Sequence, residues 1–133
     1  MSSPSRTRGK VIDAALWTLS ALLLGTLTTL SLVPSPPVGG PRPVDLILHV
    51  AAYAPTTLVL LLAAVWRPGR GPGRFPGMAG WIVAGLVLLG AGIEVVQGLG
   101  LTGPRQGEPI DALANALGVA AGFGMWSVLE TRV

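Results

Sequence analysis

GAGIEVVQGLGLTGPRQGEPIDALANALGVAAG, residues 90–122, joins two apolar runs across a short turn rich in glycine and proline. Its polar side chains recur at helical spacing, with Glu94 and Gln97 before the turn and Asp111 and Asn115 after it. Each pair therefore lies on one face of a helix. A carboxylate at the centre of a bilayer costs about 2.5 to 3.5 kcal/mol on insertion scales. We therefore expect Glu94 to face the interior of a helix bundle, where it can find polar partners.

The composition indicates a membrane protein of one domain. Of the 133 residues, 50% are hydrophobic and only 11% are charged, whereas about 25% of a soluble domain is charged. The net charge of +3 arises from basic and acidic residues that are spread thinly, without a basic helix face, so we exclude nucleic acid as a partner. The chain has no cysteine, which excludes disulfides and a thiol nucleophile.

Four apolar runs are each long enough to cross a bilayer as a helix, which takes about 20 residues. The first run follows a basic segment, as in a signal peptide, but it is too long for one and prolines stand where cleavage would occur, so we predict an uncleaved helix. We predict an all-α membrane protein, a four-transmembrane-helix bundle formed by residues 11–128, between a basic tail, residues 1–10, and a short tail, residues 129–133. The predicted spans are residues 11–33, 45–66, 78–101 and 110–128.

The distribution of basic residues predicts the orientation of the bundle. The first ten residues and the loop between the second and third spans each carry three basic residues, whereas the other two loops carry only Arg42 and Arg105. The positive-inside rule then predicts that both termini are cytoplasmic. Arginine in place of lysine, with abundant alanine, glycine and proline, is typical of a GC-rich bacterial genome. We therefore expect a multi-pass protein of the bacterial cytoplasmic (inner) membrane.

Polar side chains from three spans are predicted to meet in one layer near the outer end of the bundle. Asp45, His49 and Tyr53 recur every four residues and form a ladder along the second span. Pro55 below them should kink that helix or leave the carbonyl of Ala51 without its hydrogen bond. The third and fourth spans bring their polar residues to the same layer.

Eight residues of this layer are candidates for a functional site. The candidates for acid–base catalysis are Glu94, His49 and Asp111. The candidates for substrate binding, with an arginine suited to a phosphate or pyrophosphate group, are Arg105, Asp45, Tyr53, Gln97 and Asn115. The alternative is that these residues only hydrogen-bond the helices to one another, which in membranes contributes on average about 0.6 kcal/mol per pair.

A metal site is only weakly indicated. The carboxylates of Asp45, Glu94 and Asp111 and the imidazole of His49 are ligands of a mixed oxygen and nitrogen site. However, the sequence has no second histidine, and Arg105 in the same layer would repel a cation. We therefore predict no metal and no cofactor.

Glycine residues indicate where helices pack, and tryptophan residues indicate where the chain meets the membrane interface. Gly118 and Gly122 form a small-xxx-small pair that lets two helices approach closely. We expect this pair to pack within the chain, and the alternative is a homodimer formed through it. The lipid bilayer is the expected environment, and we interpret the tryptophans as interfacial belt residues: Trp17, Trp66, Trp81 and Trp126.

The ordered pattern resembles that of the VanZ-like family of small bacterial integral membrane proteins. The motifs that carry the resemblance, over residues 45–122, are Asp45-x3-His49-x3-Tyr53, Gly90-x3-Glu94-x2-Gln97 and Arg105-x5-Asp111-x3-Asn115-x2-Gly118-x3-Gly122. Pro55 and the proline-rich first loop depart from the family pattern. The family's name-giving member is associated with low-level resistance to the glycopeptide teicoplanin.

The resemblance implies a setting at the outer face of the membrane and supplies no reaction, so whether the chain is an enzyme stays open. It implies a protein with an outward-facing polar pocket that acts on or binds a lipid-linked cell-wall or surface-glycan component and affects glycopeptide susceptibility. The alternative is a small proton-coupled transport or membrane-assembly component with a structural polar layer.

Overall fold

The computed structural model describes residues 4–32, 42–65, 77–102 and 107–132, with side chains for all of these except 4–7 and 42. These residues form four helices and no strand: α1 Pro4–Leu32, α2 Arg42–Ala64, α3 Met78–Gly98 and α4 Pro109–Glu130. Each helix contains a segment of at least 21 residues that is long and apolar enough to cross a membrane. The prediction of an all-helical protein with four potential spans is confirmed.

The helix ends depart from the predicted ones by a few residues for local reasons. α1 begins at Pro4, within the segment expected to be a tail, because proline is well tolerated in the first turn of a helix. α3 ends at Gly98, three residues before the predicted end at Leu101. Gly100 follows with φ +72°, a left-handed conformation that glycine adopts without steric cost and that commonly terminates helices.

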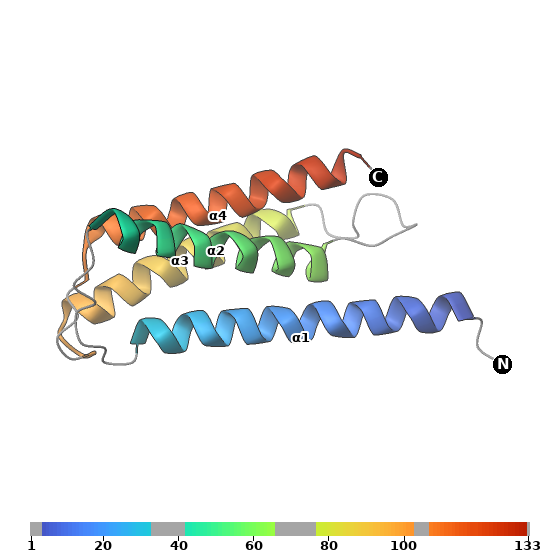
Figure 1. Cartoon of the computed structure of the whole chain (residues 1–133), viewed down its shortest axis with the longest axis horizontal. Helices are drawn as coiled ribbons and strands as arrows, with labels where there is room; N and C mark the ends of the chain where they lie inside the picture. Colours follow the sequence, from blue (N-terminus) through green and yellow to red (C-terminus); the bar gives the residue numbers. More distant parts are fainter. Residues whose placement is uncertain (1–3, 33–41, 66–76, 103–106, 133) are drawn as a thin grey trace.

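The four helices alternate in direction, so that both termini lie at one end of the bundle (Figure 1). We call this the terminal end. The opposite end, here called the loop end, holds the start of α2, the end of α3 and the start of α4 (Figure 1). α2 contacts the other three helices and packs most extensively against α4. That both termini face the cytoplasm stays a prediction.

The packing of α2 on α4 depends on two glycines of α4. A Cβ atom added at Gly118 would lie 2.7 Å from the Cβ of Tyr53 and 2.9 Å from the carbonyl oxygen of Val50. A Cβ atom added at Gly122 would lie 2.7 Å from the Cβ of Thr57. The small-xxx-small pair is therefore used within the chain, against α2, and the structure gives no support to a homodimer through it.

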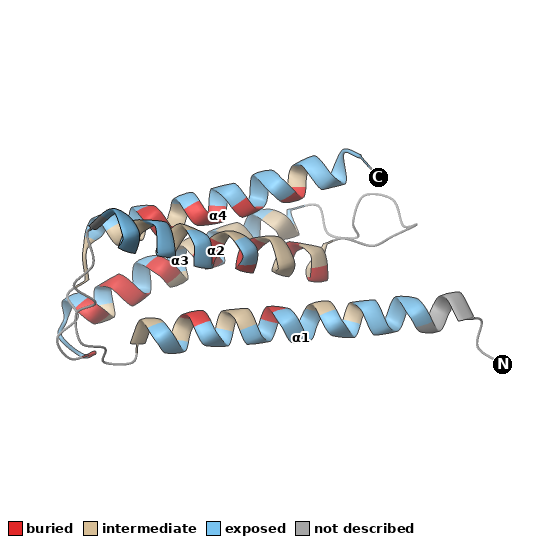
Figure 2. Ribbon diagram, in the orientation of Figure 1, coloured by how far each residue is buried: buried red, intermediate tan, exposed pale blue. Residues whose placement is uncertain are grey.

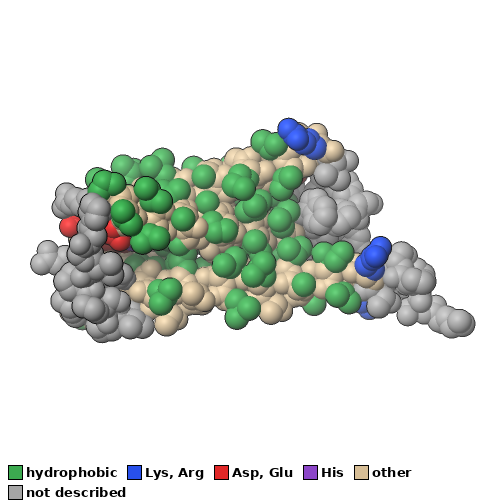
Figure 3. All heavy atoms as spheres, in the orientation of Figure 1, with side chains coloured by type: hydrophobic (Ala, Val, Ile, Leu, Met, Phe, Trp, Pro, Cys, Tyr) green, Lys and Arg blue, Asp and Glu red, His purple; other side chains and the backbone are tan. Residues whose placement is uncertain are grey.

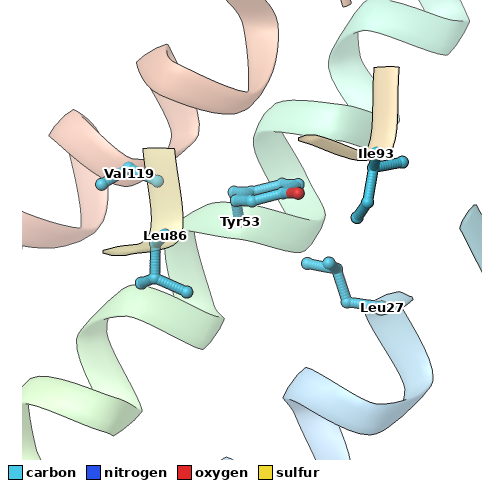
Figure 4. Packing of buried hydrophobic residues seen from close by; sticks show 5 residues of the cluster. All are labelled: Leu27, Tyr53, Leu86, Ile93 and Val119. Atoms are coloured by element: carbon cyan, nitrogen blue, oxygen red, sulfur yellow. The ribbon is translucent and has the colours of Figure 1, made fainter. Parts of the chain in front are cut away.

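The core is a thin apolar seam, and most large apolar side chains point outward. All four helices contribute to the buried cluster shown in Figure 4. It contains Leu27 of α1, Tyr53 of α2, Leu86 and Ile93 of α3, and Val119 of α4. The outward faces of all four helices carry exposed residues (Figure 2), among them Trp81 at 80% exposure. A lipid bilayer would cover this apolar surface, since a helix that is apolar all round is typical of a membrane span.

Trp126 differs from the other described tryptophans and corrects the prediction of a belt residue. It is only 6% exposed, and its ring lies 5.5 Å from that of Phe123, centroid to centroid. Trp126 continues the i, i+4 series of Gly118 and Gly122, so it lies on the inward face of α4. Trp66 lies outside the described residues.

Pro55 does not interrupt α2, which is helical on both sides of it. The two hydroxyl groups that follow it donate to carbonyls one turn earlier. Thr56 Oγ1 donates to the Ala52 oxygen at 2.7 Å, and Thr57 Oγ1 donates to the Tyr53 oxygen at 2.8 Å. Neither acceptor is the Ala51 carbonyl, which loses its donor at Pro55, so these bonds tie the two hydroxyls to their own helix.

Candidate functional site

Six of the eight predicted site residues gather at the loop end of the bundle, and we call these six the polar cluster. They come from α2, α3 and α4: Asp45, His49, Tyr53, Glu94, Asp111 and Asn115. Figure 3 shows acidic side chains at the loop end, whereas the basic side chains that it colours lie at the terminal end. Arg105 lies outside the described residues.

His49 joins α2 to α4 at the centre of the cluster. Its Nδ1 lies 2.8 Å from Oδ1 of Asn115. Because an amide oxygen can only accept, Nδ1 carries the proton in this bond. The other ring nitrogen, Nε2, lies 3.9 Å from Oδ2 of Asp45, which is longer than a hydrogen bond. The imidazole is thus held by Asn115, and one of its nitrogens lies within 4.8 Å of carboxylate oxygens of Asp45 and Asp111.

Glu94 is the deepest carboxylate of the cluster. It is 7% exposed, and its Oε2 accepts a hydrogen bond from the backbone N–H of Glu108 at 3.2 Å. The side chains of Asn115, Asp111 and His49 interact electrostatically with the carboxylate. Its second oxygen, Oε1, is buried and has no hydrogen-bond partner in the described part of the chain. A buried polar atom without a partner is a place where a ligand, water or ion is expected.

Tyr53 reaches the same region from the apolar seam. Its hydroxyl is buried and has no hydrogen-bond partner among the described residues. A Cβ atom at Gly90 would lie 3.2 Å from this hydroxyl and 3.0 Å from the Cβ of Asn115. The glycine therefore leaves the room in which Tyr53 and Asn115 approach α3.

Gln97 is engaged elsewhere. Its Nε2 donates to the carbonyl oxygen of Ser31, near the end of α1, at 2.7 Å. The side chain is buried, and this bond ties α3 to α1. Gln97 thus serves a contact between α3 and α1, outside the polar cluster.

Backbone groups supply two contacts of the site that the sequence did not indicate. The first is the N–H of Glu108, and the second is the close approach of Gly107, where an added Cβ atom would lie 2.8 Å from the carbonyl carbon of Glu94. The signal that could have revealed them is Pro109. Proline at the first position of a helix leaves the preceding residue extended, which directs the chain before α4 back toward α3.

The chemistry that this arrangement allows follows from its donor atoms. Ligand atoms of Asp45, His49 and Asp111 lie within 4.8 Å of one another, and these atom types bind divalent metal ions. The same carboxylates and imidazole can exchange protons with a bound molecule. The His49–Asn115 bond also fastens α2 to α4, so a contribution to stability exists beside any chemistry. No protein-family model, curated protein or solved structure matches the chain.

Proposed function

We propose that the chain is a VanZ-like integral membrane protein whose polar cluster binds the head group of a lipid-linked cell-wall or surface-glycan component at the outer face of a bacterial cytoplasmic membrane. The proposal combines the resemblance of the ordered motifs with the position of the cluster at one end of an apolar bundle. Such binding would alter susceptibility to glycopeptides such as teicoplanin.

The observation that carries the proposal is the gradient of exposure within the cluster. The side chain of Asp45 is 59% exposed and that of His49 23% exposed, whereas Glu94 and Tyr53 are buried. Polar groups therefore continue from the surface of the loop end into the bundle. An amphiphile fits this arrangement, because its polar head can meet the cluster while its tail lies along the apolar outer faces of the helices.

The outer location is supported by charge. The residues between α2 and α3 and the first ten residues carry six of the nine basic residues of the chain. α1 and α3 begin at the terminal end, and α2 ends there (Figure 1). A terminal end in the cytoplasm puts the loop end, with the polar cluster, outside.

A phosphate or pyrophosphate head group needs a positive partner, since three carboxylates repel it. Arg105 is suited to this role because a guanidinium binds two phosphate oxygens at once. Where the cluster also catalyses, Glu94 or the pair of His49 and Asp111 would transfer protons. Nε2 of His49 faces Asp45 and is the ring nitrogen placed for such a transfer.

A proton relay through the whole bundle is less well supported. Below Tyr53 the buried polar side chains of the described spans include Ser20, Thr56 and Thr57. Each of these hydroxyls donates to a carbonyl of its own helix, and none is ionisable near neutral pH. A relay needs groups that exchange protons along the whole path, so these residues favour a pocket open on one side.

The test compares the wild-type protein with Glu94→Gln, His49→Ala and Arg105→Ala in a strain that lacks the chain. At equal abundance in the membrane, teicoplanin susceptibility and the pool of lipid-linked precursors are measured. Loss of the phenotype with a changed precursor pool supports catalysis, and loss with an unchanged pool supports binding. Glu130→Gln, which removes an exposed carboxylate at the other end of α4, is the matched control. Three folded, fully active variants would refute the proposal.

A further inference from the structure

We propose that Tyr53, Glu94 and Asn115 form a buried subsite that binds one hydroxyl group beside Gly90 of α3. The hydroxyl group can come from a bound water or from the sugar or glycerol part of a lipid head group. The use of the subsite for a head group rests on the proposed function, and it adds a hydroxyl-bearing group to the chemistry of the ligand. The binding of a hydroxyl group as such does not depend on that function.

Two oxygen atoms of this region are buried and have no hydrogen-bond partner in the described part of the chain. They are Oη of Tyr53, a residue that is 2% exposed, and Oε1 of Glu94, a residue that is 7% exposed. A buried polar atom that stays unpaired costs folding free energy, so such atoms nearly always bond to the protein or to a bound molecule. Both oxygens therefore point to a bound group that carries its own donor and acceptor.

Gly90 brings the polar atoms of the subsite together. The position that a Cβ atom of Gly90 would take lies 3.2 Å from the hydroxyl of Tyr53 and 3.2 Å from Nδ2 of Asn115. Asn115 interacts in turn with the carboxylate of Glu94. Glu94 follows Gly90 by one turn of α3, and the side chains of a helix lean toward the preceding turn. One small group can therefore contact all three side chains.

The hydrogen-bonding capacity of these side chains matches a hydroxyl group. Oδ1 of Asn115 accepts from His49, so the donor atom Nδ2 is the part of this amide that faces Gly90. A hydroxyl group has one hydrogen to donate and two lone pairs with which to accept. It can donate to an ionised Glu94 and accept from Tyr53 and Asn115, and it can accept from a protonated Glu94 and donate to Tyr53.

Other ligand groups fit these three side chains less well. A phosphate oxygen only accepts, and the carboxylate of Glu94 would repel it when both are ionised. An ammonium group only donates, so it cannot accept from Nδ2 of Asn115. The subsite therefore favours the neutral, hydroxyl-bearing part of a head group over its charged part.

The test uses the single tyrosine of the chain, since a ¹³Cζ label on tyrosine reports on the Tyr53 hydroxyl alone. The full chain is placed in nanodiscs, and transfer of magnetisation to the label is measured by magic-angle-spinning NMR. Phosphatidylcholine has no hydroxyl in its head group, so transfer in this lipid identifies water. In phosphatidylglycerol, transfer from the C–H protons of the glycerol head group identifies the lipid. Either contact supports the subsite and states which molecule fills it.

Variants of two glycines of α3 provide a matched pair. Gly90→Ala puts a methyl group 3.2 Å from both polar atoms and should abolish the transfer, whereas Gly92→Ala, which meets nothing within 4 Å, should keep it. Tyr53→Phe deletes a hydroxyl that the subsite binds and should raise the equilibrium constant of unfolding about 2- to 10-fold. Thr57→Val, which deletes a buried hydroxyl with a known acceptor, sets the scale for this loss.

Three results would overturn the subsite. The first is no transfer to the label in either lipid. The second is a Tyr53→Phe protein at least as stable as the wild type, as expected when an unpaired hydroxyl is removed. The third is a contact that Arg105→Ala abolishes, since a guanidinium would then supply the bond. A contact without any glycopeptide phenotype would keep the subsite and reject the proposed function, whereas a phenotype without the contact would do the reverse.

Discussion

Replacing Gly118 by alanine should destabilise the bundle, although alanine is the better helix former. The added Cβ atom would lie 2.7 Å from the Cβ of Tyr53 and 2.9 Å from the Val50 oxygen. Ordinary contacts begin at 3.4 Å, so α2 must move away by at least about 0.7 Å. Neither neighbour can rotate aside, since one is a backbone atom and the other is fixed to the backbone.

The expected magnitude follows from overpacking. Forcing an extra methyl group into a packed contact costs about 1 to 3 kcal/mol. Gly124 of the same helix is exposed, and nothing lies within 4 Å of a Cβ atom added there. Gly124→Ala should therefore gain the helix propensity of alanine, about 1 kcal/mol, without a clash. Because Gly118→Ala gains the same propensity, the two variants should differ by the cost of overpacking alone, about 1 to 3 kcal/mol.

The assay is the free energy of unfolding of both variants and the wild type, measured in the same micelles by titration with a denaturing detergent and followed by circular dichroism. The pair controls for residue type, helix and membrane, because both changes are glycine to alanine in α4. Equal stabilities of Gly118→Ala and Gly124→Ala would refute the close packing of α2 on α4.

Three further changes test other parts of the structure. Gln97→Leu removes the bond from α3 to the Ser31 carbonyl and should lower stability by about 0.6 to 1.7 kcal/mol, whereas Val95→Leu on the exposed face of α3 should not; equal effects would contradict the bond. Gly107→Ala should push the chain before α4 off the Glu94 carbonyl and reproduce the phenotype of Glu94→Gln, with Gly98→Ala, which meets nothing within 4 Å, as control. Single cysteines at positions 42 and 70, in a chain without native cysteine, should react with an impermeant reagent from outside and from inside respectively; the reverse pattern would invert the orientation.

The number and approximate limits of the spans were predictable because membrane helices require long apolar runs. The meeting of His49 with Asn115 was predictable in outline, since a short turn and alternating helix directions put the start of α2 and the start of α4 at the same end. The resulting bond of 2.8 Å and the choice of Asn115 as its acceptor needed the structure.

Hydrophobicity alone did not give the inward face of each span, which only polar residues and glycines such as Glu94 and Gly118 indicated. Lipid is as apolar as the core of a membrane protein, so hydrophobicity does not distinguish the two sides of a helix. Trp126 was assigned to the membrane interface for this reason, whereas it lies inside. Gln97 was assigned to the polar layer, and its amide binds α1, since helical spacing fixes a direction around the axis and leaves the partner open.

Gly118 links the packing of α2 on α4 to the geometry of the polar cluster. Gly118 lies one turn after Asn115, and its close neighbour Val50 follows His49 directly. The approach of the two backbones at this glycine therefore sets how far the imidazole is from the amide. A shift of α2 by about 0.7 Å would lengthen a bond of 2.8 Å to the limit of hydrogen bonding. Gly118→Ala should for this reason also break the bond between His49 and Asn115, which the NMR shift of the His49 imidazole N–H would report, while Gly124→Ala should leave that shift at the wild-type value. An unchanged imidazole shift in a destabilised Gly118→Ala protein would show that the cluster is positioned by its own bonds and not by the glycine.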